Sequence, residues 1–349
     1  MSMRLHLPLL ALLLSFTLSA HAGFEEAVAA IKAKDVKLAV DEARKGADAG
    51  DPRACYLLGQ FYREGIGVEA DKHQAQAWTE KAAQGGVVRA INDLARGYLN
   101  GQGMPKDVFM AIQWARQSAS SGNAEGQYLL AMATHSSELS YTDSNGKLDQ
   151  VRLQQLAARP VSARSADVEF ADNMFRAGAQ NYPPAMLPLV ARWSQDVGFG
   201  NRQRLEALIP RLPAALPPAL MQYVDIARQL DKLGDTLVSP TLFVRTQGVG
   251  LSAAMVQACP DYDGKDKARL EAQAQKGFKV ISAKVTQPLA NAVFLPSSIP
   301  EYQHAQLISG QWDEEWTYEV CDKKVPVRFH FTADGMGSAN PAIIGQTGR

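Results

Sequence analysis

The sequence predicts a mainly α-helical protein: an α-solenoid of helix–turn–helix repeats, followed by a small α+β domain at the C-terminal end. Three observations carry this prediction. The chain repeats itself with a period of 36 residues between residues 54 and 114, and apolar residues in that part recur every three or four positions. After about residue 316 the apolar residues alternate instead, which is typical of half-buried strands. With 349 residues the chain is long enough for two or three domains.

Residues 1–22 have the pattern of a secretory signal peptide. Arg4 supplies the positive start, an apolar run covers Leu7–Leu18, and Ala20-His21-Ala22 is a small-x-small cleavage site. The apolar run is too short to cross about 30 Å of hydrocarbon, so we expect no transmembrane anchor. A lipid anchor would need a cysteine after the cleavage site, where Gly23 stands. We therefore expect cleavage near Ala22–Gly23 and a periplasmic or otherwise secreted protein.

Eight positions recur after 36 residues with the same residue type. Two Gly-x-Gly elements and two tryptophans fall in register, which indicates a repeat solenoid. The matching sets are Ala54, Leu58, Tyr62, Gly65, Gly67, Asp71, Ala75 and Trp78, followed by Ala90, Leu94, Tyr98, Gly101, Gly103, Asp107, Ala111 and Trp114.

One repeat reads as a helix, a glycine turn and a second helix. Ala54, Leu58 and Tyr62 step by four and share one helix face. The Gly-x-Gly element ends that helix, because glycine adopts a positive φ at low cost. Asp71 is placed to cap the next helix, on which alanine and tryptophan form the apolar stripe. A single helix pair cannot bury its own apolar face, so the repeats must stack.

The pattern from Ala54 to Gly85 resembles the Sel-one-like repeat (suppressor/enhancer-of-lin type), which is related to the tetratricopeptide repeat. The resemblance covers about residues 23–134, with a degenerate unit before Asp51 and an incomplete copy from Gly126 that fails at Thr134. It implies an α-solenoid that serves as a protein-interaction scaffold. In exported bacterial members it implies partners in envelope assembly, polysaccharide export or signalling.

The remaining chain divides into two parts. Residues 135–238 return to helical patterning interrupted by prolines, and we interpret them as a degenerate helical extension of the solenoid. Residues 239–349 form the predicted α+β domain. Its expected elements are a helix over 267–275, strands over 278–285, 316–320 and 325–331, a hairpin turn at 322–324 and a further turn at 333–335.

The three cysteines have different expected roles. Cys259 and Cys321 both fall in the C-terminal domain, and an oxidising compartment favours a disulfide between them. Cys55 lies in the first repeat helix beside Ala54, where a small buried apolar role is the better interpretation.

The sequence contains only partial matches to catalytic and metal-binding motifs. The acidic run Asp313–Glu315 between two tryptophans could supply a glycosidase carboxylate pair, but neighbouring residues on a strand point to opposite faces, so we expect an acidic cluster at a strand edge. Ser144-Asn145-Gly146-Lys147 matches S-x-x-K without its companion motifs and is typical of a turn. We expect no cofactor and no metal site, because no ligand spacing joins the histidines of the secreted chain: His73, His135, His304 and His330.

Composition argues against a partner held by bulk charge. Lys plus Arg and Asp plus Glu are both 36, and without the signal peptide the balance is 35 basic to 36 acidic residues, a net charge of −1. This argues against a nucleic-acid partner. Recognition must then come from local charge patterns.

The favoured function is that of a non-enzymatic, exported scaffold that binds proteins through the concave face of the solenoid. In phase with the apolar stripe, the exposed candidates on that face are Gln60 and Arg63 in one repeat and Arg96 and Asn100 in the next. The alternative is a cell-wall or carbohydrate hydrolase with its active residues in the C-terminal domain. A cleft there with two carboxylates, or with a nucleophile and a base, would favour it.

Overall fold

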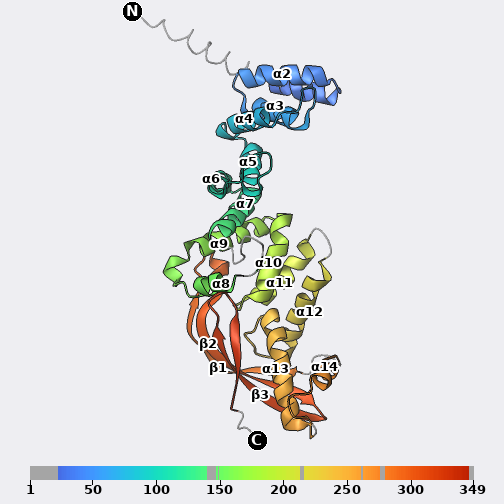
Figure 1. Ribbon diagram of the computed structural model, residues 1–349, viewed down its shortest axis with the longest axis vertical. Coiled ribbons are helices and arrows are strands. Elements are labelled where there is room, and N and C mark those ends of the chain that lie inside the picture. Colours follow the sequence, from blue (N-terminus) through green and yellow to red (C-terminus); the bar gives the residue numbers. More distant parts are fainter. Residues whose placement is uncertain are drawn as a thin grey trace, which may run out of the picture. The chain divides into compact units, whose positions relative to one another are not determined.

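The computed structural model describes residues 23–139, 147, 149–212, 216–260, 262–275 and 280–345. The chain separates into two compact units, unit 1 (Met1–Ser137) and unit 2 (Glu138–Arg349) (Figure 1). The predicted signal peptide lies outside the described residues, as do the first three residues of the S-x-x-K motif.

Unit 1 is a run of antiparallel helix pairs, as the repeat pattern predicts. A helix over residues 23–32 is followed by α2 (Val36–Asp48), α3 (Pro52–Glu64), α4 (Lys72–Gln84), α5 (Val88–Asn100), α6 (Val108–Ser120) and α7 (Ala124–Thr134), with the π-helical turn η1 (His135–Leu139) at its end. From α2 to α7, each helix packs on its neighbour in sequence. The helical solenoid is thereby confirmed for this part of the chain.

The repeated residues have the local roles that their chemistry predicts. Asp71 caps α4 by accepting hydrogen bonds from the backbone N–H groups of His73 (2.8 Å) and Gln74 (3.1 Å), and Asp107 caps α6 in the same way. Gly65 ends α3 at a φ of 68° and Gly101 ends α5 at a φ of 71°. The second glycines of the two elements also have positive φ angles: Gly67 and Gly103.

Alanine and leucine make the core of unit 1. Ala54, Leu58, Ala90 and Leu94 are fully buried, and the partly buried Trp78 packs against the same cluster. Trp114 also contacts this cluster. Cys55 is buried and free, and burial raises the pKa of its thiol, in keeping with the apolar role expected for it.

The helices of unit 2 precede and cover a sheet. They are α8 (Gln150–Ala157), α9 (Ser165–Ala179), α10 (Pro183–Gln195), α11 (Asn201–Leu208), α12 (Pro218–Leu233), α13 (Pro240–Ala258) and α14 (Lys267–Gln275), with short 3₁₀ turns η2 (Val161–Ala163), η3 (Ile209–Arg211) and η4 (Pro300–Tyr302). The division predicted near residue 239 falls inside this unit, because Val197, Leu230 and Val238 share one core with the sheet. Helix α14 has the predicted bounds, whereas α13 was not predicted.

The sheet is a four-stranded antiparallel meander with the order β1-β2-β3-β4. Its strands are β1 (Val280–Phe294), β2 (Leu307–Val320), β3 (Lys323–Ala333) and β4 (Ala339–Ile344). The hairpin turn lies one to two residues earlier in the chain than predicted. Cys321 and Asp322 form it, with φ angles of 48° and 58°, while Lys323 already belongs to β3. Strand β4 was not predicted, and its Pro341 suits an edge strand because proline donates no ladder hydrogen bond.

One face of the sheet packs on α13, whose Phe243 contacts the ring of Trp316 at a centroid distance of 5.1 Å. Cys259, just after α13, forms the predicted disulfide with Cys321 of the hairpin turn. The bond links the covering helix to the sheet. Among the described residues no helix is long and apolar enough to cross a membrane.

Candidate functional site

The candidate site in unit 1 is a groove across two consecutive repeats, which we call the repeat groove. It has a volume of about 300 Å³ and lies between α3, α4, α5 and the loop that follows α5. Its polar lining includes Arg63, Lys72, Gln76, Asp93 and Arg96. The groove is therefore lined by polar and apolar residues from two first helices, from α4 between them and from the following loop.

Asp93 of α5 organises this groove. Its Oδ2 accepts hydrogen bonds from the Tyr56 hydroxyl (3.1 Å), from Gln60 Nε2 (3.3 Å) and from Arg63 Nη1 (3.0 Å), all on α3. Its Oδ1 accepts from Arg96 Nη1 (3.1 Å), one turn along α5. One carboxylate thus ties the first helices of neighbouring repeats together and fixes two guanidinium groups at the groove.

Similar polar contacts join α5 to the first helix of the next repeat, α7. Arg96 also forms an ion pair with Glu125 of α7, and Asn92 Nδ2 donates to Glu125 Oε2 at 2.9 Å. Polar side chains of α3 and of α5 therefore each contact an acid on the first helix of the next repeat. Such contacts between neighbours fix the stacking of a solenoid.

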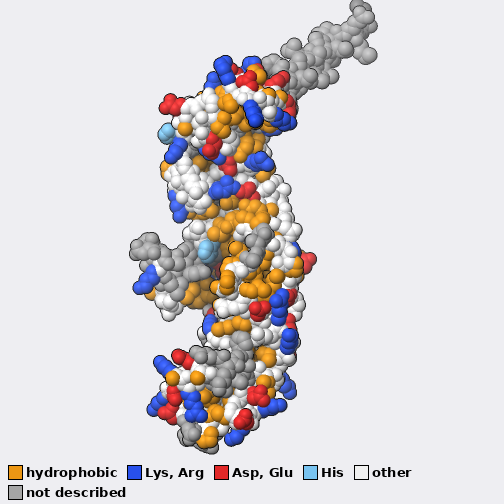
Figure 2. Space-filling model, turned by 90° about the vertical axis from the view of Figure 1, so that its right-hand side faces the viewer, with side chains coloured by type: hydrophobic (Ala, Val, Ile, Leu, Met, Phe, Trp, Pro, Cys, Tyr) orange, Lys and Arg blue, Asp and Glu red, His pale blue; other side chains and the backbone are white. Residues whose placement is uncertain are grey.

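The groove carries more positive than negative charge. Arg63, Lys72 and Arg96 line it together with the carboxylate of Asp93, and Glu125 is a second acidic partner of Arg96. Arg63 and Arg96 keep 39% and 41% of their side-chain surface exposed, so their charges also face solvent. Burial and the Asp93 charge raise the pKa of Tyr56 to about 12, which keeps its hydroxyl a donor at neutral pH. On the face drawn in Figure 2, basic and acidic side chains are interspersed over unit 1, so this excess is local.

The structure brings together three of the four residues predicted on this face. Arg63 and Arg96 line the groove, and Gln60 contacts its central acid. Asn100, the last residue of α5, is exposed and does not line the groove. Sequence reasoning missed Asp93 and Lys72. The spacing of three between Asp93 and Arg96 could have indicated the first, because residues three apart share a helix face.

The acidic run of β2 divides between the two faces of the sheet. Asp313 lies 2.6 Å from His330 Nδ1, and Glu315 accepts a hydrogen bond from Arg328 Nε at 2.9 Å. Glu314 instead points into the core and is fully buried. The expectation of an acidic cluster at a strand edge is therefore wrong for Glu314, and β2 pairs on both sides within the sheet.

Glu314 accepts four hydrogen bonds from fixed donors. Its oxygens bind the indole N–H groups of Trp312 (2.8 Å) and Trp316 (2.7 Å), the hydroxyl of Thr236 (2.6 Å) and the backbone N–H of Leu237 (2.8 Å). Burial raises the pKa of this carboxyl, and the four donors oppose the rise. The pattern Trp-x-Glu-x-Trp, with a period of two, was the available signal that all three side chains share one face.

The helix pairs and the recurring caps define a helical-repeat protein. The chain contains, more particularly, two Sel1 repeats: the Sel1 repeat family model matches residues 52–87 and 88–123. Sel1 repeats are protein-interaction scaffolds and are generally non-catalytic. The two matches follow the predicted period of 36 residues and contain α3 to α6.

One solved structure that this chain matches is a Sel1 repeat protein from Oxalobacter formigenes. The identity is 21% and the TM-score is 0.29, and the match covers 48% of this chain and 97% of that chain. Another is a protective antigen of uropathogenic Escherichia coli strains that displays an SLR fold, with 18% identity, a TM-score of 0.36, and 69% of this chain and 56% of that chain covered. No curated protein matches the chain.

Proposed function

We propose that this chain is an exported scaffold that binds an acidic segment of a protein partner in the repeat groove. The observation that carries the proposal is the groove itself, a cavity of about 300 Å³ across two repeats with three cationic side chains and one carboxylate. Complementary charge favours an anionic partner segment and disfavours a basic one.

Lys72 is the cation most available to a partner. It is exposed at the first turn of α4, and no ion pair or hydrogen bond to it is found within the described part of unit 1. Arg63 and Arg96 are both held by Asp93, and Arg96 also by Glu125, while 39% and 41% of their side-chain surfaces stay exposed. Pre-positioned arginines lose less side-chain entropy when they bind a carboxylate.

Two features support export. The pattern of residues 1–22 is that of a cleaved signal peptide. The disulfide between Cys259 and Cys321 suits an oxidising compartment such as the periplasm. In that compartment, envelope or polysaccharide-export components are the proposed partners, and unit 2 supplies a second contact surface or localises the scaffold.

Affinity capture from periplasmic extract tests this function with the chain that begins at Gly23. We compare the wild type with Lys72→Glu, which leaves the Asp93 network intact, and with the double variant R63Q/R96Q. Lys37→Glu is the matched charge control, because Lys37 is 91% exposed on α2 and does not line the groove. We expect partners that are lost with both groove variants and retained by the control. Identical capture by all four chains would show that the groove does not bind them.

A further inference from the structure

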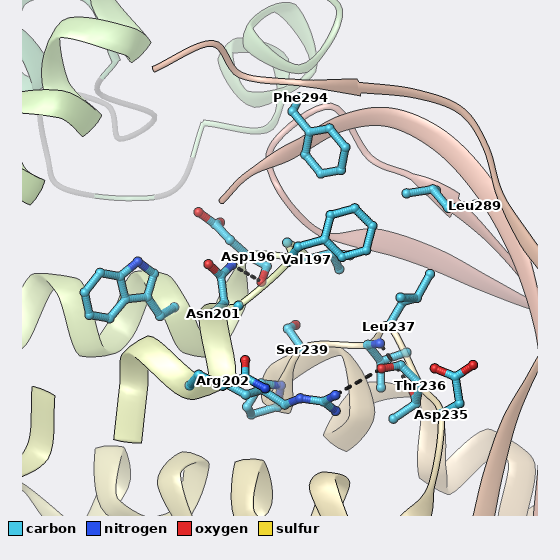
Figure 3. A pocket seen from close by; sticks show the side chains of 17 residues that line it. Asp196, Val197, Asn201, Arg202, Asp235, Thr236, Leu237, Ser239, Leu289 and Phe294 are labelled. Atoms are coloured by element: carbon cyan, nitrogen blue, oxygen red, sulfur yellow. Dashed lines mark hydrogen bonds between the residues drawn. The ribbon is translucent and has the colours of Figure 1, made fainter. Parts of the chain in front are cut away.

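Unit 2 contains a second cavity that the scaffold function does not use, here called the unit 2 pocket. It has a volume of about 300 Å³ and is formed by three segments: the α10–α11 connection, the α12–α13 connection, and Leu289 with Phe294 of β1 (Figure 3). Cavities of this size hold small ligands or single large side chains.

The walls of the unit 2 pocket are fixed by buried hydrogen bonds. Asn201 Nδ2 donates to the backbone carbonyls of Asp196 (3.0 Å) and Ala305 (2.7 Å). Thr236 and Leu237 both donate to Glu314, so the α12–α13 connection is held on the sheet. The pocket is therefore preformed, which lowers the entropy cost of binding.

Aromatic side chains line this pocket and one of them is poorly covered. Trp193, Phe199 and Phe294 all contribute to the lining, and the Phe199 and Phe294 rings lie 5.6 Å apart. Phe199 is 50% exposed, although a phenylalanine gains free energy by burial. A preformed cavity lined by aromatic and apolar side chains with a few polar groups is typical of a small-ligand site.

Three charged side chains line the unit 2 pocket: Asp196, Arg202 and Asp235. Arg202 is engaged by Asp231 (Nε to Oδ1, 3.1 Å) and by the Thr236 carbonyl (3.2 Å). Asp196 lies 3.1 Å from Arg192 Nε. Asp235 is exposed, and within the described residues no hydrogen bond or ion pair engages its carboxylate. In Figure 3 the carboxyl groups of Asp196 and Asp235 lie on opposite sides of the pocket, so they do not form a catalytic pair.

We propose that the unit 2 pocket binds a small organic cation: an ammonium or guanidinium group on an apolar stem. The cation would pair with Asp235, and the stem would lie against Phe199, Phe294 and Leu289. Aromatic faces attract cations as well as apolar groups, so the same lining serves both parts of the ligand. The chemistry is shared by free amines and by the lysine or arginine side chain of a peptide.

Isothermal titration of the full disulfide-bonded chain tests this site with three probes of similar shape: phenethylammonium, 2-phenylethanol and phenylacetate. We expect saturable binding of the ammonium probe at one site, weaker binding of the alcohol and none of the carboxylate. A lysine-containing tripeptide with blocked ends distinguishes the two sources. Tighter binding of the tripeptide assigns the pocket to a basic side chain, and tighter binding of phenethylammonium assigns it to a free amine.

Two variants test whether the probes bind in the unit 2 pocket. Asp235→Asn should weaken binding of the ammonium probe by about tenfold, and Phe199→Ala should weaken binding of both the ammonium and the alcohol. Glu271→Gln, an exposed carboxylate change on α14, is the control and should leave both unchanged. Equal ammonium binding by the wild type and Asp235→Asn would overturn the proposal, and so would tighter binding of phenylacetate or no saturable binding of either cation.

Discussion

Replacing Glu314 by glutamine tests the buried hydrogen-bond network around this carboxylate. The change preserves the shape of the side chain but exchanges one acceptor oxygen for an NH₂ group. In the wild type each carboxylate oxygen accepts two hydrogen bonds, one of them from an indole N–H. The amide can satisfy only two of the four donors through its oxygen. The Thr236 hydroxyl can rotate and accept from the new NH₂ group, whereas an indole N–H cannot.

The best arrangement of the glutamine therefore leaves one buried N–H group unpaired. Such a group costs about 1–3 kcal/mol of the free energy of unfolding. Glu314→Leu leaves all four donors unpaired, and we expect it to cost more than about 4 kcal/mol and to prevent unit 2 from folding. The matched control is Glu315→Gln on the opposite face, where the ion pair with the 62% exposed Arg328 is worth at most about 1 kcal/mol.

Urea unfolding of the disulfide-bonded chain, followed by tryptophan fluorescence, measures these differences, because Trp312 and Trp316 are both buried in unit 2. We expect a lower midpoint for Glu314→Gln than for Glu315→Gln at the same m-value. A midpoint for Glu314→Gln at or above that of Glu315→Gln would refute the reasoning, since it would mean that the carboxylate costs more to bury than its four donors return.

Three further predictions concern unit 2. Burial raises the pKa of Asp196 to about 7, so the folded chain retains a proton that the unfolded chain loses above about pH 4. The free energy of unfolding of the wild type should therefore fall between about pH 4 and pH 7, by up to ~4 kcal/mol, and this fall should be absent from Asp196→Asn in urea titrations across that range. The disulfide closes a sequence separation of 62 residues, so its removal in C259S/C321S should lower the free energy of unfolding by about 4 kcal/mol. The urea midpoint of this variant should be lower than that of the wild type, and adding a reductant should not change it further. An added methyl group at Gly250 would overlap the hydroxyl of Tyr318, so Gly250→Ala should lower the thermal midpoint of unfolding. At Gly248 no described heavy atom lies within 4 Å of the added methyl group, so Gly248→Ala should raise or preserve that midpoint.

The sequence was sufficient for the repeats because their determinants are local. Asp71 caps the helix that begins one residue later, and Gly65 ends the helix to which it is attached. Each interaction spans a few residues and recurs after 36, so pattern and structure coincide. Arg63 and Arg96 could be placed on one face for the same reason, because helical periodicity fixes direction within a repeat.

Interactions between distant segments could not be predicted in this way. Asp93 accepts from Tyr56, 37 residues earlier, and the repeat period gives no reason for an acid at that position. Glu314 depends on Thr236, 78 residues away, and this contact requires the α12–α13 connection to lie against the sheet. Helix α13 was missed because apolar residues occur around most of its circumference, which removes the periodicity that identifies a surface helix.

Selection from a random peptide library tests the repeat groove most directly. The chain that begins at Gly23 is used as bait, and enriched peptides are measured by fluorescence anisotropy against the wild type, Lys72→Glu and the Lys37→Glu control. We expect enrichment of acidic peptides whose affinity falls at least about tenfold for Lys72→Glu and is unchanged for the control. Enrichment of peptides without negative charge, or equal affinity for the wild type and Lys72→Glu, would contradict it.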